Sequence, residues 1–221
     1  MLRIQNEPDI IAAIRPVCQP VSGINSALHR AVYLDSVHTL SQLPVDDGIE
    51  VAIAGRSNAG KSSLINRMCR QNALARTSRT PGRTRQLVFF RLDEARHLVD
   101  LPGYGYAKVG GDLKKHWHGL IQAYLDQREA LIGLVVVMDI RHPMKPQDIE
   151  LIEWAGQRGL GLHLVLTKAD KLGRGKQKEQ LLKVRRMVHE DVGVQTFSAT
   201  SGQGLDELYS IMANWYGAAA G

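Results

Sequence analysis

The sequence contains no long hydrophobic run. The longest, Leu131 to Met138, stops at Asp139 and is far too short to span a bilayer. The first twenty residues carry Arg3, Glu7 and Asp9 within or beside their only hydrophobic patch, which is not the pattern of a secretory signal peptide. We therefore expect neither a membrane segment nor an export signal.

Cysteine and aromatic residues are also scarce. The two cysteines, Cys18 and Cys69, lie far apart and have no histidine partners at metal-ligand spacing. This pattern favours reduced thiols in a cytoplasmic protein over a disulfide or a metal site. Aromatic residues make up 5% of the chain and form no RNA-stacking motif, so recognition of a specific RNA sequence is not indicated.

The chain does contain a glycine loop of fixed pattern. Gly55-Arg56-Ser57-Asn58-Ala59-Gly60-Lys61-Ser62 fits G-x-x-x-x-G-K-[ST] and lies between the apolar run 51–54 and the helical pattern 63–68. A strand, loop and helix in this order cradle phosphates, because free backbone N–H groups and the positive helix end point at them. We expect Lys61 to reach the β- and γ-phosphates of a nucleoside triphosphate and the Ser62 hydroxyl to hold Mg²⁺.

A second motif indicates the base. Thr167-Lys168-Ala169-Asp170 follows the apolar run 160–166, which places it at the ligand edge of an open α/β sheet. The Asp170 carboxylate can accept hydrogen bonds from N1–H and the 2-amino group of guanine, whereas adenine has no donor at N1. Polar pairing of this kind rejects the wrong ligand strongly. The Lys168 stem can lie over the base, and Phe197-Ser198-Ala199 could offer the Ala199 N–H to guanine O6. GTP is therefore the predicted nucleotide.

Two further segments are typical of a nucleotide-dependent switch. Asp100-Leu101-Pro102-Gly103 ends the apolar stretch 97–99, so Asp100 can orient the Mg²⁺ shell and the Gly103 N–H can touch the γ-phosphate. The segment 80–85 has the composition of a loop, and Thr84 is the candidate hydroxyl that completes Mg²⁺ coordination when the γ-phosphate is present. Such a loop would be ordered by GTP and released after hydrolysis.

Tyr104 stands where Ras-like switches carry the glutamine that positions the attacking water. A tyrosine cannot do that in the same way, so unaided hydrolysis should be slow and a partner or an ion should supply what is missing. The alternative is that Tyr104 only packs in the fold.

Together these segments resemble the bacterial EngB (YihA/YsxC) ribosome-biogenesis GTPases, members of the TrmE-Era-EngA-EngB-Septin-like P-loop GTPases. The resemblance runs from about residue 31 to residue 216. It rests on EVAIAGRSNAGKSSLIN (50–66), TPGRT (80–84), DLPGYGYA (100–107), DIRHP (139–143) and TKAD (167–170). The combination of GRSNAGKSS with DLPGYGYA is the specific part.

The resemblance implies a set of GTP contacts. They are Gly55, Arg56, Ser57, Asn58, Ala59, Gly60, Lys61, Ser62, Gly82, Arg83, Thr84, Arg85, Gln86, Asp100, Leu101, Pro102, Gly103, Thr167, Lys168, Ala169, Asp170, Phe197, Ser198 and Ala199. Mg²⁺ would be held by Ser62 and Thr84. Asn58 matches the asparagine that helps hold K⁺ in similar potassium-dependent GTPases, where the cation acts like an arginine finger. Lys61, Gly103 and Asn58 would then support catalysis, and no side chain is a convincing general base.

The family is associated with assembly of the large ribosomal subunit and with normal cell division and septation. The net charge of +6 is uneven, with eight arginines between Arg67 and Arg96 and a second basic cluster at 174–186. Such patches suit an rRNA phosphate backbone, although a solvated helix face explains the second cluster about equally well. We expect a cytoplasmic, monomeric GTP-hydrolysing switch whose partner is the large ribosomal subunit or an rRNA-containing precursor.

Two other classes of protein stay open at this point. A phosphate-loop kinase would need an acceptor pocket and a lid, and it has no reason to carry the motif 167–170. A non-hydrolysing guanine-nucleotide sensor or division scaffold is harder to exclude, because the predicted turnover is slow.

The alternation of strand-like and helical runs predicts an α/β, Ras-like P-loop GTPase fold of three layers. Its sheet would be mostly parallel and six-stranded, with helices on both faces. We place strands at 50–54, 86–92, 96–100, 132–138, 161–166 and 193–197, and helices at 61–70, 111–128, 146–158, 175–190 and 205–216. An N-terminal extension, 1–47, would contain one helix from Leu28 to Leu40 after a loose start at 1–22. Residues 48–217 would form the GTP-binding domain and 218–221 a flexible tail.

Overall fold

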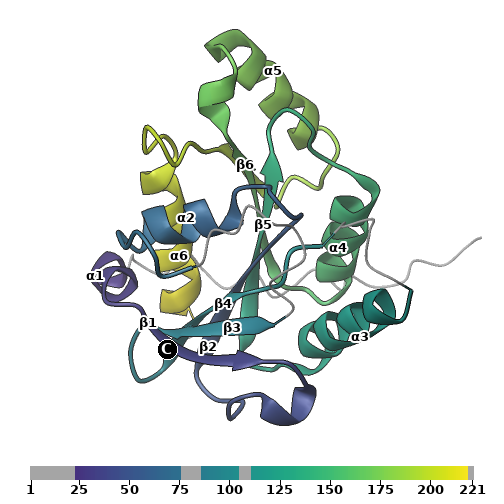
Figure 1. Cartoon of the computed structure of the whole chain (residues 1–221). Helices are drawn as coiled ribbons and strands as arrows, with labels where there is room; N and C mark the ends of the chain where they lie inside the picture. The colour runs from purple at the N-terminus through teal and green to yellow at the C-terminus, as the bar shows by residue number, and fades with distance from the viewer. Residues whose placement is uncertain (1–22, 76–85, 105–110, 219–221) are drawn as a thin grey trace, which may run out of the picture.

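The computed structural model describes residues 23–75, 86–104 and 111–218, with the backbone alone for 111–118 and 218 (Figure 1). The described strands form one sheet in the order β1-β3-β4-β2-β5-β6-β7. They are β1 (Val32–Val37), β2 (Ile49–Gly55), β3 (Leu87–Arg91), β4 (Arg96–Asp100), β5 (Leu131–Asp139), β6 (Gly161–Thr167) and β7 (Gly193–Thr196). The five strands from β4 to β7 are parallel, whereas β1–β3 and β3–β4 pair antiparallel.

Helices cover both faces of this sheet. They are α1 (Ile24–His29), α2 (Lys61–Met68), α3 (Gly111–Gln127), α4 (Pro146–Gln157), α5 (Arg174–Arg185) and α6 (Leu205–Ala218), with short 3₁₀ turns η1 (Leu40–Gln42) and η2 (Ala169–Lys171). In Figure 1, α1, α2 and α6 lie on one side of the sheet and α3 and α4 on the other. The predicted α/β class, the three layers and the mostly parallel sheet are therefore confirmed.

Side chains of the central strands alternate between two apolar layers. On β2, Val51 and Ile53 pack with the α1, α2 and α6 side, whereas Ala52 and Ala54 pack with the α3 and α4 side. This alternation follows from the two-residue period of a strand. Because both faces are covered, the strand is a continuous apolar run instead of alternating with polar residues.

The N-terminal helix predicted from Leu28 to Leu40 is wrong. Helix α1 ends at His29, and residues 32–37 form β1, an edge strand that makes the sheet seven-stranded. Val32 and Tyr33 are strand-forming residues but are 47% and 58% exposed, so the segment lacks the alternating pattern that would identify a strand. Its pairing with β3 is a long-range contact, and that contact decides its conformation.

All six predicted strands and the five remaining predicted helices are confirmed, with ends that differ by a few residues. The largest difference is α5, which ends at Arg185 and not at residue 190. The chain turns there because the Met187 N–H donates back to the Val184 carbonyl at 2.9 Å.

A buried ion pair fixes the chain as it enters β2. Glu50 is 0% exposed and accepts hydrogen bonds from the Arg128 guanidinium and, at 2.8 Å, from the Tyr124 hydroxyl. Arg128 also donates to the carbonyls of Pro44 and Val45 at 2.7 and 3.0 Å. These bonds tie the segment before β2 to the end of α3.

Two glycines on neighbouring strands make room for Trp215, which packs against the core. Gly133 and Gly161 are register partners in β5 and β6. A Cβ built on either would lie 2.6 or 2.7 Å from the Trp215 ring. Only glycine therefore lets this ring lie flat against both strands.

Gly161→Ala should lower the free energy of unfolding by about 1–3 kcal/mol, because the added methyl group must displace the Trp215 ring. Gly156→Ala is the matched control, since a Cβ at Gly156 in α4 has no atom within 4 Å. The control should stabilise by about 0.5–1 kcal/mol through helix propensity. Chemical denaturation measures both. Equal stability of the two variants would show that Trp215 is not packed against the glycine pair.

Candidate functional site

The phosphate loop joins β2 to α2. Strand β2 ends at Gly55, and α2 begins at Lys61, so the loop between them leads directly into a helix N-terminus. Asn58 has φ +64° and Gly60 has φ +103°, in the left-handed region. A Cβ on Gly60 would also lie only 3.2 Å from Thr167 Oγ1. The second motif glycine is thus required both by the backbone turn and by a close neighbour.

Lys61 points across the site to the end of β4. Its ammonium contacts the Asp100 carboxylate in a buried ion pair, with the two residues 8% and 5% exposed. Burial raises the pKa of the Asp100 carboxyl, and the Lys61 charge beside it opposes that rise. The ion pair of Lys61 and Asp100 therefore connects the phosphate loop to the end of β4.

The segment after Asp100 is fastened to β2 and to the phosphate loop. Leu101 N–H donates to the Ile53 carbonyl at 3.0 Å, and Tyr104 N–H donates to the Gly55 carbonyl at 3.3 Å. In the other direction, Ser57 N–H donates to the Tyr104 carbonyl at 3.0 Å. The predicted switch residues 100–103 are thus brought against the phosphate loop.

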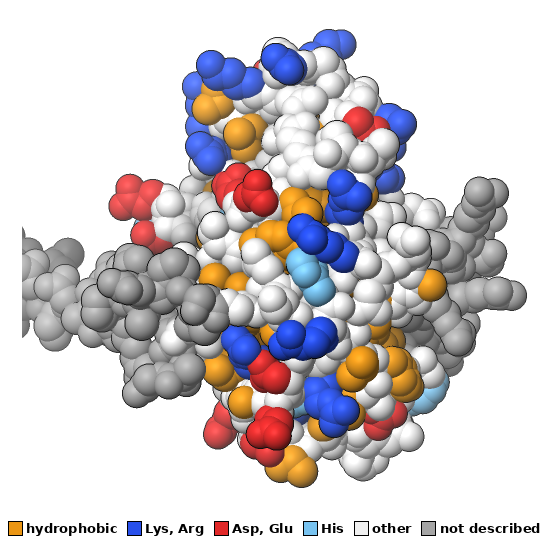
Figure 2. Space-filling model, turned by 90° about the vertical axis from the view of Figure 1, so that its left-hand side faces the viewer, with side chains coloured by type: hydrophobic (Ala, Val, Ile, Leu, Met, Phe, Trp, Pro, Cys, Tyr) orange, Lys and Arg blue, Asp and Glu red, His pale blue; other side chains and the backbone are white. Residues whose placement is uncertain are grey.

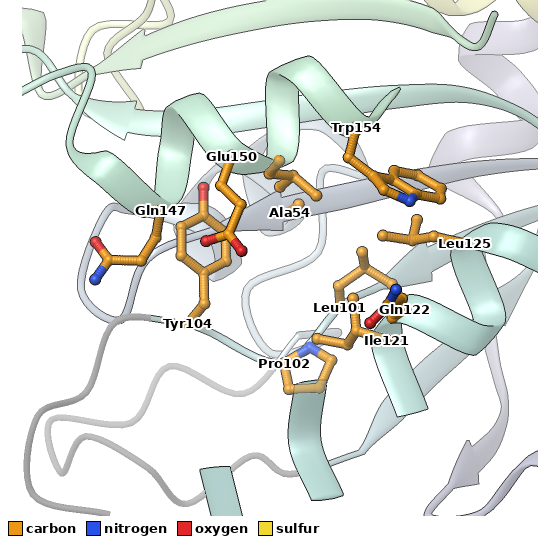
Figure 3. A pocket seen from close by; sticks show the side chains of 11 residues that line it. Ala54, Leu101, Pro102, Tyr104, Ile121, Gln122, Leu125, Gln147, Glu150 and Trp154 are labelled. Carbon is orange, nitrogen blue, oxygen red and sulfur yellow. The ribbon is translucent and has the colours of Figure 1, made fainter. Parts of the chain in front are cut away.

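The Tyr104 side chain points toward α4 (Figure 3). Its hydroxyl donates to Asp148 Oδ1 at 2.8 Å, and the ring is 7% exposed. It borders a mainly apolar cavity of about 160 Å³ between α3 and α4, to which Leu101 and Trp154 also contribute. Burial raises the pKa of the Tyr104 phenol, with the Asp148 charge second, so the phenol stays protonated at neutral pH. Tyr104 packs here, as the alternative interpretation held.

The guanine motif is connected to the phosphate loop by hydrogen bonds. Thr167, the last residue of β6, donates its hydroxyl to the Ala59 carbonyl and also contacts the Met138 carbonyl at 3.0 Å. Lys168 has φ +59°, and its ammonium donates to the Asn58 carbonyl at 2.7 Å. Two loops that are more than 100 residues apart in sequence therefore meet at one edge of the sheet.

The two segments predicted to surround the base also meet each other. Ala169 N–H donates to the Phe197 carbonyl at 3.1 Å, and the buried Ser198 hydroxyl donates to Asp170 Oδ1 at 2.7 Å. This hydrogen bond from Ser198 is the main cause that lowers the pKa of Asp170. The carboxylate is accordingly ionised and keeps its acceptor character at neutral pH.

Asp139, at the end of β5, was not assigned to the site from sequence. Its carboxylate accepts from Arg141 Nη2 at 2.6 Å and lies 2.9 Å from Lys168 Nζ. Burial alone would raise the pKa of Asp139, but the hydrogen bonds from Arg141 and Lys168 lower it. The sequence signals were its place after an apolar run and the segment DIRHP (139–143), in which it is the first residue. The structure adds that Asp139 is in register with Thr167.

Part of the predicted set lies outside the described residues, namely Gly82, Arg83, Thr84 and Arg85. Gln86 is described and precedes β3, where its side-chain amide contacts the His38 ring. The second Mg²⁺ ligand predicted from sequence, Thr84, is among the residues without a described position.

The donor set fits Mg²⁺. In the described part of the chain, no three His, Cys, Asp or Glu residues gather as a metal cage. Mg²⁺ does not need one, because it keeps several waters and binds through one or two protein oxygens plus substrate phosphates. Ser62 in the first turn of α2 and Asp100 at the end of β4 supply hard oxygen atoms of that kind.

Comparison with known proteins places this arrangement in a family. The family described as 50S ribosome-binding GTPase matches residues 50–168. The chain is 56% identical over 200 residues to a probable GTP-binding protein EngB of Xylella fastidiosa (strain 9a5c), covering 89% of this chain and 98% of that protein. It is 57% identical over 194 residues to one of Xanthomonas oryzae pv. oryzae (strain PXO99A), covering 86% of this chain and 94% of that protein.

A solved structure agrees with the fold. The crystal structure of a probable GTP-binding protein engB superposes with a TM-score of 0.62 at 20% identity, over 76% of this chain and 99% of that chain. The matched GTPase segment, the two relatives and the meeting of the loops 55–62 and 167–170 at one sheet edge are consistent with one another. The chain belongs to the EngB family of GTP-binding proteins, within the P-loop GTPases.

Proposed function

We propose that this chain is a Mg²⁺-dependent GTP-hydrolysing switch that assists assembly of the large ribosomal subunit and is thereby required for normal cell division and septation. The observation that carries the proposal is the joining of the phosphate loop to the guanine loop by Thr167 and Lys168. In this proposal residues 48–217 form the GTP-binding unit and residues 1–47 an extension, of which the described part, 23–47, packs on that unit through α1 and β1. The protein acts as a cytoplasmic monomer.

Phosphate binding would use the backbone N–H groups of the loop 55–62 together with Lys61. The Lys61 ammonium contacts Asp100 in the structure, so the triphosphate has to draw it away from that carboxylate. Asp100 would then be free to orient the water shell of Mg²⁺, and Ser62 and Thr84 would hold the ion. The metal would supply charge neutralisation at the β- and γ-phosphate oxygens.

Base recognition would rest on Asp170, with Lys168 lying along the base and Ala199 offering its N–H to guanine O6. The Ser198 hydroxyl occupies one oxygen of Asp170 and fixes the orientation of the carboxylate. This fixed orientation supports selection of guanine. A carboxylate that is already oriented loses less conformational entropy when it accepts hydrogen bonds from the N1–H and 2-amino groups.

Hydrolysis would be attack of water on the γ-phosphate, assisted by positioning and charge neutralisation. The Gly103 N–H would touch the γ-phosphate, since Gly103 lies beside Ser57 of the phosphate loop. Tyr104 is hydrogen-bonded to Asp148, so it is not in place to orient a water. Slow unaided turnover follows, and K⁺ held by Asn58 would supply the missing positive charge.

The partner would be the large ribosomal subunit or an rRNA-containing precursor. The description of the matching family, 50S ribosome-binding GTPase, supports this, as does the basic surface of the chain. The GTP-bound protein would bind the particle and the GDP-bound protein would leave it, so GTP hydrolysis would set how long the protein stays bound during one assembly step. The second candidate, a non-hydrolysing guanine-nucleotide sensor or division scaffold, is favoured only by the position of Tyr104.

Asp170→Asn should exchange the nucleotide preference. An amide donor suits the C2 carbonyl of xanthine, so the variant should bind XTP and lose at least about a hundredfold in affinity for GTP. Direct titrations with fluorescent GTP and with fluorescent XTP measure the change, with Asp170→Glu as a control that keeps the charge. Retention of full GTP selectivity by Asp170→Asn would remove Asp170 from base recognition.

Replacing NaCl by KCl should raise GTP turnover by at least about tenfold, because a cation beside the phosphates offsets the charge that develops there. Asn58→Ala should remove most of this difference, while GDP affinity stays close to that of the unchanged chain. Single-turnover hydrolysis measures the rate. Equal rates in the two salts would contradict a K⁺ site at Asn58.

Large-subunit particles should pellet this protein in the presence of a non-hydrolysable GTP analogue and release it in GDP. The physical reason is that the γ-phosphate orders the contacts of the switch segments and so changes the surface offered to the particle. Sedimentation with purified large and small subunits measures the difference. Equal pelleting in both nucleotides would favour the scaffold interpretation.

A further inference from the structure

A basic groove lies between α5 and the loop that follows β5. Nine residues line it, around a cavity of about 250 Å³: Arg141, His142, Pro143, Met144, Lys145, Gln180, Lys183, Val184 and Met187. Four of the nine are Arg, His or Lys and none is Asp or Glu. The groove is therefore suited to an anionic ligand.

One wall is formed by α5 and the turn that follows it. Gln180, Lys183 and Val184 recur at the three- and four-residue spacing of one helix side, and Met187 lies in the turn after α5 ends at Arg185. Val184 is fully buried and anchors this wall, whereas Met187 is 50% exposed and Lys183 is also exposed. The wall thus presents a cation and an apolar side chain at the rim of the groove.

The opposite wall is held firmly. Arg141 makes a bidentate ion pair with Asp139, in which Nε donates to Oδ1 at 2.9 Å and Nη2 donates to Oδ2 at 2.6 Å. That uses two of the five guanidinium donors, which leaves donors for a ligand. Lys145 N–H donates to the buried Asp148 at 2.9 Å, which fixes the loop at the start of α4. The Arg141 guanidinium and the backbone of the loop at Lys145 are therefore held in place.

The charge of the groove is not cancelled locally. Across the described ranges, neither Lys145 nor Lys183 has an acidic oxygen within ion-pair distance. Two acids among the described residues contact the loop. Asp139 is shared between Arg141 and Lys168, so that group of three carries a net positive charge. Asp148 is buried and accepts from the Lys145 N–H and the Tyr104 hydroxyl. In Figure 2, Lys and Arg side chains gather at the top of the molecule, where Figure 1 shows α5.

We propose that this groove, between the loop 141–145 and α5, binds the phosphate backbone of RNA. The inference rests on the proposed function, in which the partner is a ribosomal particle. Cations on two facing walls match a strand that carries phosphates along its length. No Phe, Tyr or Trp is among the lining residues, and cations predominate over groups that stack on bases, so the groove is suited to the backbone and not to a base sequence.

The groove is also connected to the nucleotide site. On one side, Arg141 binds Asp139, Asp139 binds Lys168, and Lys168 donates to the Asn58 carbonyl of the phosphate loop. On the other side, Asp148 accepts both from Lys145 N–H and from the Tyr104 hydroxyl. RNA bound in the groove therefore lies within two or three contacts of the loop that holds the triphosphate.

The test compares two double variants of the full chain. Lys145→Gln with Lys183→Gln removes two charges from the groove. Arg174→Gln with Lys178→Gln is the control, because it removes two charges from exposed positions of α5 that do not line the groove. Lys178 lies about 140° around the helix from Lys183 and Arg174 about 180°.

Binding is measured by fluorescence anisotropy with a labelled 20-nucleotide RNA of mixed sequence, across a range of salt concentrations. The groove variant should bind about tenfold more weakly, and its slope of log affinity against log salt should fall by about 1.4, for two lost phosphate contacts at about 0.7 each. The control variant should change affinity by less than about twofold, with a slope close to that of the unchanged chain.

Three outcomes would contradict the proposal that this groove binds RNA. They are equal loss in the control variant, an unchanged salt slope in the groove variant, and tighter binding of poly-L-glutamate than of RNA with the same dependence on Lys145 and Lys183. The last result would assign the groove to an acidic protein.

The proposed function is tested separately by GTP turnover without RNA, which the groove variant should retain in full, and by pelleting. A groove variant that pellets with large subunits as well as the unchanged chain would refute the groove and leave the switch intact. Failure of the unchanged chain to hydrolyse GTP or to pellet would remove the proposed function itself.

Discussion

Two hydrogen bonds from the end of β6 to carbonyl groups of the phosphate loop hold the candidate site together. Thr167 donates to Ala59 and Lys168 to Asn58, so the segments that would grip the phosphates and the base keep a fixed relation. The parallel sheet makes this contact available, because the carboxyl ends of β2, β5 and β6 meet at one edge. The buried pair of Lys61 and Asp100 closes the same edge from β4.

The same edge extends outward to the surface. Asp139 accepts a hydrogen bond from Arg141 of the loop 141–145 and contacts Lys168. Asp148 accepts from the backbone N–H of Lys145 in the same loop and from the Tyr104 hydroxyl. A change at the triphosphate can therefore reach α4 and the basic groove through a few polar contacts, without a rearrangement of the core. Both carboxylates are well buried or paired, which gives these contacts a defined geometry instead of a fluctuating surface one.

The sequence predicted the central sheet and the placement of the loops 55–62 and 167–170 after their strands, because these signals are contiguous. A phosphate loop has to follow a strand and begin a helix, and a guanine loop has to follow another strand. Edge strand β1 was missed because Val32 and Tyr33 are exposed and its partner β3 lies some fifty residues further on. The Tyr104–Asp148 bond and the groove were missed for a related reason. Tyr104 and Asp148 are 44 residues apart, so no local pattern records their meeting.

The account is tested most directly by a crystal structure with a non-hydrolysable GTP analogue and Mg²⁺. It predicts that the Lys61 ammonium leaves Asp100 and lies against the β- and γ-phosphates, while guanine pairs with Asp170 and the bonds from Thr167 and Lys168 to the phosphate loop persist. A nucleotide bound elsewhere, with the Lys61–Asp100 pair intact and Asp170 far from the base, would contradict it.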